Sequence, residues 1–129
     1  MGERILVIDD DMAVRITVER LLARGGMAVS AVSAASEALI LADLERFDLV
    51  ICDLVMPDID GFTAIRTFKD KYPDMAIIAM SGGARLGTFD TLALARDAGA
   101  DELLRKPFDV ASLMTAVKGA LFRRTNGKN

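Results

Sequence analysis

Residues Leu49 to Pro57 read LVICDLVMP, an apolar run that carries one carboxylate and stops at a proline. Such a run, bounded by a turn, is typical of a strand buried on both faces of a parallel sheet. The proline disfavours helix at Met56, and Asp60-Gly61 adds turn chemistry before a helical pattern begins at Phe62. We therefore expect Asp53 at the carboxyl end of a central strand, where open α/β sheets collect ligands and reactive groups.

Outward from that strand, the chain alternates between strand-like and helix-like patterns. Short apolar runs predict strands at residues 4–8, 27–32, 49–53, 75–80 and 102–105. Apolar residues at helical spacing predict helices at about residues 12–24, 35–44, 62–71, 89–98 and 110–122. Asp11, Ser33 and Asp109 are candidate N-caps for three of these helices. Five βα units predict an α/β fold, a doubly wound five-stranded parallel sheet with helices on both faces.

The composition fits one globular domain and excludes several kinds of protein. The chain has 129 residues, of which 52% are hydrophobic and 27% charged, with a net charge of −3. No basic face is evident, so we expect no nucleic-acid binding by this domain. No apolar run approaches the roughly 18 residues that a membrane span needs, and the first residues do not resemble a signal peptide.

Cysteine and histidine are the informative rare residues. Cys52 is the only cysteine, so no internal disulfide can form, which fits a cytoplasmic protein. Cys52 alternates away from Asp53 along the strand, and we expect a small buried apolar side chain rather than a nucleophile. The chain has no histidine, which excludes Ser–His–Asp triads, histidine metal sites and a histidine phosphoacceptor.

Polar side chains follow four of the five predicted strands. Asp9 and Asp10 come after the first, Asp53 ends the third, Ser81 follows the fourth, and Lys106 follows the fifth. Three carboxylates at one edge repel one another, and oxygen-only ligands of this kind suit Mg²⁺. A carboxylate can also be the nucleophile that accepts a phosphoryl group. The lysine and the hydroxyl would then neutralise and bond the phosphoryl oxygens.

Each of these residues also has a simpler interpretation. Asp11 is best explained as a helix cap, whereas capping alone does not explain the pair Asp9 and Asp10. Ser81 begins a Ser-Gly-Gly sequence that is also ordinary loop chemistry. Lys106 alone would be an exposed residue before a turn. The combination of all of them at predicted strand ends favours a site.

The motifs around these residues resemble a known family in order and along most of the chain. They are ILVIDDD at residues 5–11, DLVICDLVMPDIDG at 48–61, Ser81-Gly82, Gly99-Ala100-Asp101 and Lys106-Pro107-Phe108. From about Arg4 to Leu121 the sequence resembles the receiver domains of response regulators in two-component signalling. This resemblance implies the flavodoxin-like strand order 2-1-3-4-5.

The same resemblance implies a Mg²⁺ site around the phosphoacceptor Asp53. Asp10 would bind the ion directly, and Asp9 would hold a metal-bound water or share the ion. The backbone carbonyl of Val55 would be a further protein ligand.

For the phosphoryl group, the resemblance implies contacts from Ser81 and Lys106. Ser81 would hydrogen-bond the phosphoryl oxygens and change rotamer with phosphorylation. Lys106 would pair with the phosphoryl group or the acidic pocket, and the Lys106–Pro107 bond would be cis.

The sequence departs from this family at two places. Many receivers have an aromatic residue three positions before the lysine, where this chain has Leu103. The segment between Ser81 and Lys106 is also a few residues longer than in many receivers, with the extra length at residues 82–88. We expect this glycine-rich loop to be mobile.

These inferences predict a receiver domain at residues 1–124, a short C-terminal tail at 125–129 and no effector domain. We expect a cytoplasmic phosphoacceptor, not an enzyme, that assists its own phosphorylation and dephosphorylation. Its partners would be a sensor histidine kinase or histidine phosphotransfer protein and an unknown output protein. Two alternatives stay open: an aspartate-nucleophile phosphatase or phosphotransferase, which usually has a second Asp where this chain has Val55, and a phosphorylation-independent interaction module.

Overall fold

The computed structural model describes residues 2–56, 58–82 and 90–126. The predicted turn at Pro57, residues 83–88 of the predicted mobile loop, the helix start at Phe89 and residues 127–129 of the predicted tail lie outside this range.

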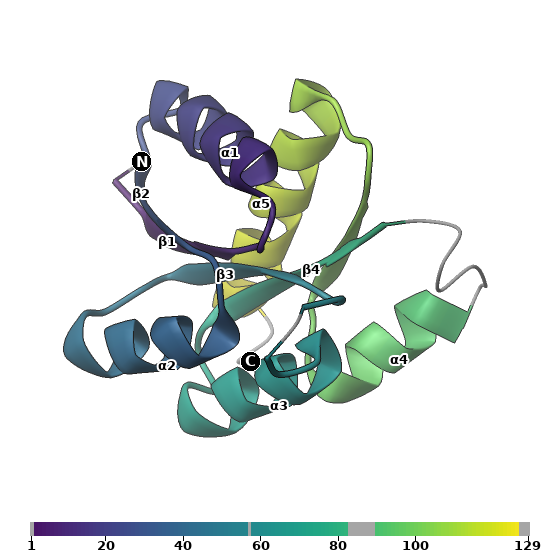
Figure 1. The fold of residues 1–129 in the computed structure, drawn as a ribbon. Helices are drawn as coiled ribbons and strands as arrows, with labels where there is room; N and C mark the ends of the chain where they lie inside the picture. The colour runs from purple at the N-terminus through teal and green to yellow at the C-terminus, as the bar shows by residue number, and fades with distance from the viewer. Residues whose placement is uncertain (1, 57, 83–89, 127–129) are drawn as a thin grey trace.

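Five parallel strands form one sheet in the order β2-β1-β3-β4-β5, which confirms the predicted fold class and strand order. The strands are β1 (Arg4–Ile8), β2 (Ala28–Val32), β3 (Leu49–Asp53), β4 (Ala76–Ser81) and β5 (Glu102–Arg105). The helices are α1 (Met12–Arg24), α2 (Ala35–Leu44), α3 (Gly61–Lys71), α4 (Asp90–Ala98) and α5 (Val110–Asn126). Figure 1 shows α1 and α5 on one face of the sheet and α2, α3 and α4 on the other.

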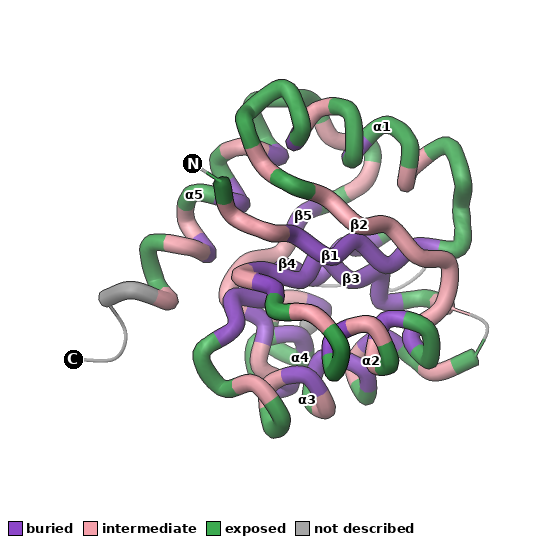
Figure 2. Tube along the Cα trace, turned by 90° about the vertical axis from the view of Figure 1, so that its left-hand side faces the viewer, coloured by how far each residue is buried: buried purple, intermediate pink, exposed green. Residues whose placement is uncertain are grey.

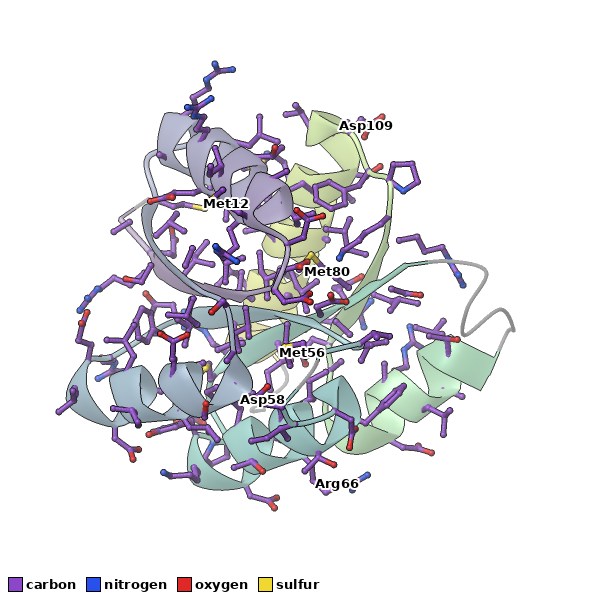
Figure 3. All side chains as sticks on the ribbon, in the orientation of Figure 1. Met12, Met56, Asp58, Arg66, Met80 and Asp109 are labelled. Atoms are coloured by element: carbon purple, nitrogen blue, oxygen red, sulfur yellow. The ribbon has the colours of Figure 1, made fainter. Side chains whose placement is uncertain are left out.

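The core has two halves, one on each face of the sheet. All five residues of β3 are buried, as its apolar sequence predicts. Val50 and Cys52 of β3 belong to the cluster under α2, α3 and α4, whereas Leu49 and Ile51 belong to the cluster under α1 and α5. The labelled side chain of Met80 lies in this second half (Figure 3). Because successive side chains of β3 point to opposite faces of the sheet, this one strand contributes to both halves of the core.

Five boundaries differ from the sequence-based expectation. Strand β2 begins one residue late, at Ala28, and β4 is shifted by one residue at both ends, to Ala76–Ser81. Helix α3 begins one residue early, at Gly61. Helix α5 continues through Asn126, past the expected end and into the predicted tail. Its last turns are held by long-range contacts, because Arg124 Nη1 bonds the Asp48 carboxylate at 3.1 Å and Arg123 Nε bonds Glu102 at 2.7 Å. Such contacts between distant segments leave no local sequence pattern.

The helix caps give a second correction. Asp11 and Asp109 cap as predicted, accepting from the backbone N–H groups of Ala13 and Ser112 at 2.9 and 2.7 Å. Ser33 does not cap α2: its hydroxyl donates instead to the carboxylate of Glu37. The first turn of α2 is capped from another loop.

Asp58 makes that cap, since its carboxylate accepts from the backbone N–H of Ser36 at 3.1 Å. Figure 3 shows Asp58 beside the end of α2. The hydrogen bonds, with that of Ser36 the largest, lower the pKa of Asp58. The loop after β3 is thus tied to α2 on one side.

Gly61 ties the same loop to α3 on its other side. Its backbone N–H donates to the carbonyl of Leu54 at 3.0 Å. A Cβ added at Gly61 would lie within 3.0 Å of three backbone atoms, which belong to Asp53 and Leu54. Only a glycine lets the start of α3 approach the end of β3 this closely.

The first prediction follows from this close approach. Gly61→Ala should lower the free energy of unfolding by about 1–3 kcal/mol, because the clash is with backbone that cannot rotate away. Urea unfolding measures the change. Gly82→Ala is the control, since a Cβ there meets nothing within 4 Å. Equal stability of the two variants would contradict the close-packing argument.

Candidate functional site

The carboxyl ends of β1, β3 and β5 bring the predicted charged side chains into one pocket. A carboxylate oxygen from each of Asp9, Asp10 and Asp53 lies within 4.8 Å of the other two. The pocket has a volume of about 540 Å³ and is lined by Asp9, Asp10, Asp11, Asp53, Val55, Gly82 and Lys106. Topology alone predicted this gathering, because parallel strands end at one edge.

Lys106 bridges two of the three carboxylates. Its Nζ lies 2.6 Å from Asp9 Oδ2 and 3.2 Å from Asp53 Oδ2. The Lys106–Pro107 peptide bond is cis, as the family resemblance implies. The backbone N–H of Lys106 donates to the carbonyl of Ser81 at 2.7 Å, so the ends of β4 and β5 are joined beside the pocket.

Asp9 is held more tightly than the other carboxylates. Its side chain is fully buried, and its Oδ1 accepts from the backbone N–H of Asp11 at 2.9 Å. Its backbone carbonyl accepts from Arg15 Nη1 at 2.9 Å. Arg15 was not predicted as a site residue, although its position on the helix that follows the first strand places it near Asp9.

Burial and neighbouring charges shift the pKa values of Asp53 and Lys106. Burial, and next the charge of Asp9, raise the pKa of Asp53, while Lys106 opposes that rise. For Lys106, burial alone would lower the pKa, but the hydrogen bond to Asp9 and the charges of Asp53 and Asp9 outweigh it. The pKa of Lys106 is therefore raised, and its ammonium persists at neutral pH.

The pKa of Asp53 determines how this group affects stability. Because the folded pKa lies above the unfolded value of about 3.9, the folded chain binds this proton more tightly. The resulting stabilisation is fully present below the unfolded pKa and is lost as pH rises through the folded pKa. At neutral pH the ionised Asp53 therefore opposes folding.

The second prediction is that removing the carboxyl group of Asp53 affects stability differently at pH 4 and pH 7. Asp53→Asn removes the titration, so its unfolding free energy relative to wild type should be higher at pH 7 than at pH 4. Urea unfolding without divalent cations at both pH values gives the difference. Asp70→Asn, at an exposed position on α3, is the matched control. A relative stability of Asp53→Asn that falls between pH 4 and pH 7 would contradict the raised pKa.

The donor set fits a hard divalent cation. Three carboxylates converge, one of them on the exposed Asp10, so incoming ions can reach the cluster. Oxygen donors of this kind suit Mg²⁺ rather than softer metals. Val55 lines the same pocket.

The remaining sequence-predicted residues lie around the pocket. Ser81 is buried at the end of β4, next to β3 and β5 in the sheet. Leu103 is partly buried and packs against the core cluster under α2, α3 and α4. Cys52 is fully buried, and burial raises the pKa of its thiol, which confirms that it is no exposed nucleophile.

A lysine-bridged acidic pocket at the carboxyl edge of this sheet is typical of signalling domains that accept a phosphoryl group. The chain belongs to the response regulator receiver domain family, whose model matches residues 5–118. Family members in general act as phosphoacceptors, bind Mg²⁺ in an acidic pocket and receive phosphoryl groups from kinases or phosphotransfer proteins.

Two curated relatives show the kind of protein in which this domain occurs. The response regulator MprA of Mycolicibacterium vanbaalenii is 38% identical over 125 residues, which are 97% of this chain and 52% of that protein. The DNA-binding transcriptional regulator NtrC of Proteus hauseri is 32% identical over 91% of this chain and 24% of its own length. The chain thus spans about half, or less, of the length of these relatives.

Solved structures agree with the fold. A CheY-like receiver domain protein from Methanospirillum hungatei has a TM-score of 0.88 and 26% identity, covering 98% of this chain and 99% of its own. NtrX from Brucella abortus has a TM-score of 0.91 and 25% identity, covering 99% of this chain and 29% of its own. Within the described residues, no helix is long and apolar enough to cross a membrane.

Proposed function

We propose that this domain is a switch that accepts a phosphoryl group on Asp53 in a Mg²⁺-dependent reaction. The bridge from Lys106 Nζ to Asp9 and Asp53 carries the proposal, because it aims a cation at the carboxylate that would react. The donor would be a histidine kinase or a histidine phosphotransfer protein. This chemistry is the general activity of the family, and its placement on Asp53 rests on the pocket.

In the proposed reaction, an Asp53 carboxylate oxygen forms a bond to phosphorus as the bond between phosphorus and the donor nitrogen breaks. The donor imidazole, which carries a proton on its other ring nitrogen, leaves with the bonding electron pair as a neutral ring, and Asp53 becomes an acyl phosphate. Lys106 holds positive charge beside the transferred oxygens.

Asp9, Asp10, Asp53 and the Val55 carbonyl would hold the metal ion. When bound, Mg²⁺ would supply charge neutralisation for the carboxylates and the phosphoryl oxygens. Asp9 contributes from a fixed position, since its side chain and its backbone carbonyl both accept hydrogen bonds.

The response to phosphorylation would begin at Ser81. Its buried position at the end of β4 places it beside the acidic pocket, and its carbonyl already joins β4 to Lys106. Leu103 offers neither a ring nor a hydroxyl, and it already packs against the core. We propose that Ser81 and Lys106 carry the differential contacts and that a movement of Leu103 is secondary.

Output would pass to a partner protein or to a domain outside these 129 residues. We propose a cytoplasmic location on the basis of the family. No observation favours the phosphatase alternative, because the second carboxylate of such enzymes is replaced by Val55, whose side chain is half exposed and apolar.

The third prediction is that acetyl phosphate with Mg²⁺ adds one phosphoryl group per chain. Intact-mass spectrometry should show this on wild type and on Asp70→Asn, while Asp53→Asn should show at least a tenfold loss. Asp10→Ala should also lose at least tenfold in labelling, and its calorimetric Mg²⁺ affinity should fall. Full labelling of Asp53→Asn would refute the assignment of the phosphoacceptor.

The fourth prediction separates Ser81 from Leu103. With beryllofluoride as a phosphoryl mimic, amide exchange in wild type should change most in the segment that begins at Ser81 and Gly82, and less in β5. Ser81→Ala should still bind the mimic but lose most of that change, whereas Leu103→Ala should keep it and lose stability by about 2–3 kcal/mol through reduced packing. The reverse result would make Leu103 the residue that transmits the change.

A further inference from the structure

Strand β2 forms one edge of the sheet and has an unusual composition for an exposed edge. Its five residues, Ala-Val-Ser-Ala-Val at positions 28–32, include no charge and no proline. One is exposed and four are partly buried. Figure 2 looks onto this edge, where β2 crosses in front of the sheet between α1 above and α2 below, and no labelled helix covers it.

The opposite edge of the sheet is protected in a different way. Strand β5 has only four residues, and charged side chains stand at both of its ends, Glu102 and Arg105. Glu102 is also engaged, because it pairs with Arg123 and lies against Gly119 of α5. Short charged edges resist pairing with another chain, whereas an uncharged regular edge invites it. Only β2 lacks this protection among the two edges of the described sheet.

The hydrogen bonds between β2 and β1 determine which backbone groups face outward. The Ala28 N–H donates to Glu3 at 2.9 Å, and the Val32 carbonyl accepts from Asp9 at 3.2 Å. In a parallel ladder these groups alternate, so positions 28, 30 and 32 bond β1. The backbone N–H and C=O groups of Val29 and Ala31 therefore point away from the sheet.

We propose that β2 is a self-pairing edge, at which two copies of this chain join antiparallel about a two-fold axis at Ser30. In this register Val29 lies opposite Ala31 of the partner subunit, and each pair exchanges two backbone hydrogen bonds. Ser30 faces Ser30 of the partner subunit in a non-hydrogen-bonded pair. An isologous contact requires such self-complementarity.

The register follows from which residues of β2 turn their backbone N–H and C=O groups outward, and from the sizes of the side chains. A shift by one residue would set an outward-facing residue against an inward-facing one and lose the ladder. A shift by two would leave part of β2 unpaired, so the register centred on Ser30 alone pairs all five residues. It also sets each valine against an alanine, which balances volume across the new ladder, and it brings no charges together.

The proposed pairing leaves the acidic pockets open. In an antiparallel pair, the carboxyl ends of the two β2 strands point in opposite directions, so the two pockets lie at opposite ends of the dimer. Pairing is therefore independent of Asp53. Four backbone hydrogen bonds across a short edge make a small interface, so we expect a weak dimer that forms with rising concentration.

Disulfide trapping tests the register. Non-hydrogen-bonded antiparallel partners have Cα atoms about 4.5 Å apart, within the range of about 4.4–6.8 Å that a disulfide spans. Ser30→Cys should therefore give a covalent dimer on mild oxidation, while the native Cys52 is fully buried and stays silent. Ala28→Cys is the matched control, because in this register its two copies lie about 13 Å apart and should cross-link at least tenfold less.

A second variant tests the backbone contacts. Ala31→Pro in the Ser30→Cys background removes an outward N–H that β1 does not use, and proline is tolerated on such an edge. Cross-linking should fall at least tenfold with the circular dichroism spectrum unchanged. Ser30→Lys, which places like charges on the axis, should weaken self-association in sedimentation equilibrium at least tenfold and does not depend on the proline.

Equal cross-linking of Ser30→Cys and Ala28→Cys would overturn the proposal. Wild-type chain that sediments as a monomer up to about 1 mM would also overturn it. No phosphoryl donor or metal is present in these assays. A failure of the pairing is therefore distinguishable from a failure of phosphorylation at Asp53.

Discussion

Charge neutralisation at the carboxyl edge of the sheet is the constraint on which the site depends. Asp9 is fully buried and Asp53 nearly so, and their charges repel each other. Two such carboxylates are costly unless a cation is hydrogen-bonded to them. Lys106 meets that need with a single ammonium that reaches both. In the proposed reaction, an incoming phosphoryl group would therefore compete for, or share, the cation that already neutralises these carboxylates.

The scaffold keeps this bridge in register through backbone contacts as well as side chains. Lys106 follows β5 and is tied to Ser81 through its N–H, while Asp9 follows β1 and is tied to Arg15 through its carbonyl. The loop after Asp53 is fixed between α2 and α3 by Asp58 and Gly61. Each charged group is consequently positioned by contacts with a neighbouring element of the fold.

The sequence predicted the sheet and the gathering of the charged residues because both follow from local composition. A strand buried on both faces must be apolar throughout, as at Leu49–Asp53, and parallel strands end at one edge. Caps made within one turn, such as that of Asp11, are equally local. The contacts that escaped prediction join distant segments: Asp58 replaces Ser33 as the cap of α2, and Arg124 reaches Asp48 to extend α5. Their partners are set by the packed fold, so no spacing rule reveals them.

The carboxyl edge of the sheet and the β2 edge differ in the kind of group on which they depend. At the carboxyl edge Lys106 pairs with both Asp9 and Asp53, so a change at any one of these charges alters the surroundings of the others. The β2 edge depends instead on backbone groups, which every residue supplies, and on the absence of charge at positions 28–32. A single lysine at Ser30 would remove the pairing capacity of this edge without disturbing the core, because Ser30 is only partly buried and does not line the acidic pocket. The proposed association at β2 can therefore vary independently of the acidic pocket, whose residues the rest of the fold constrains.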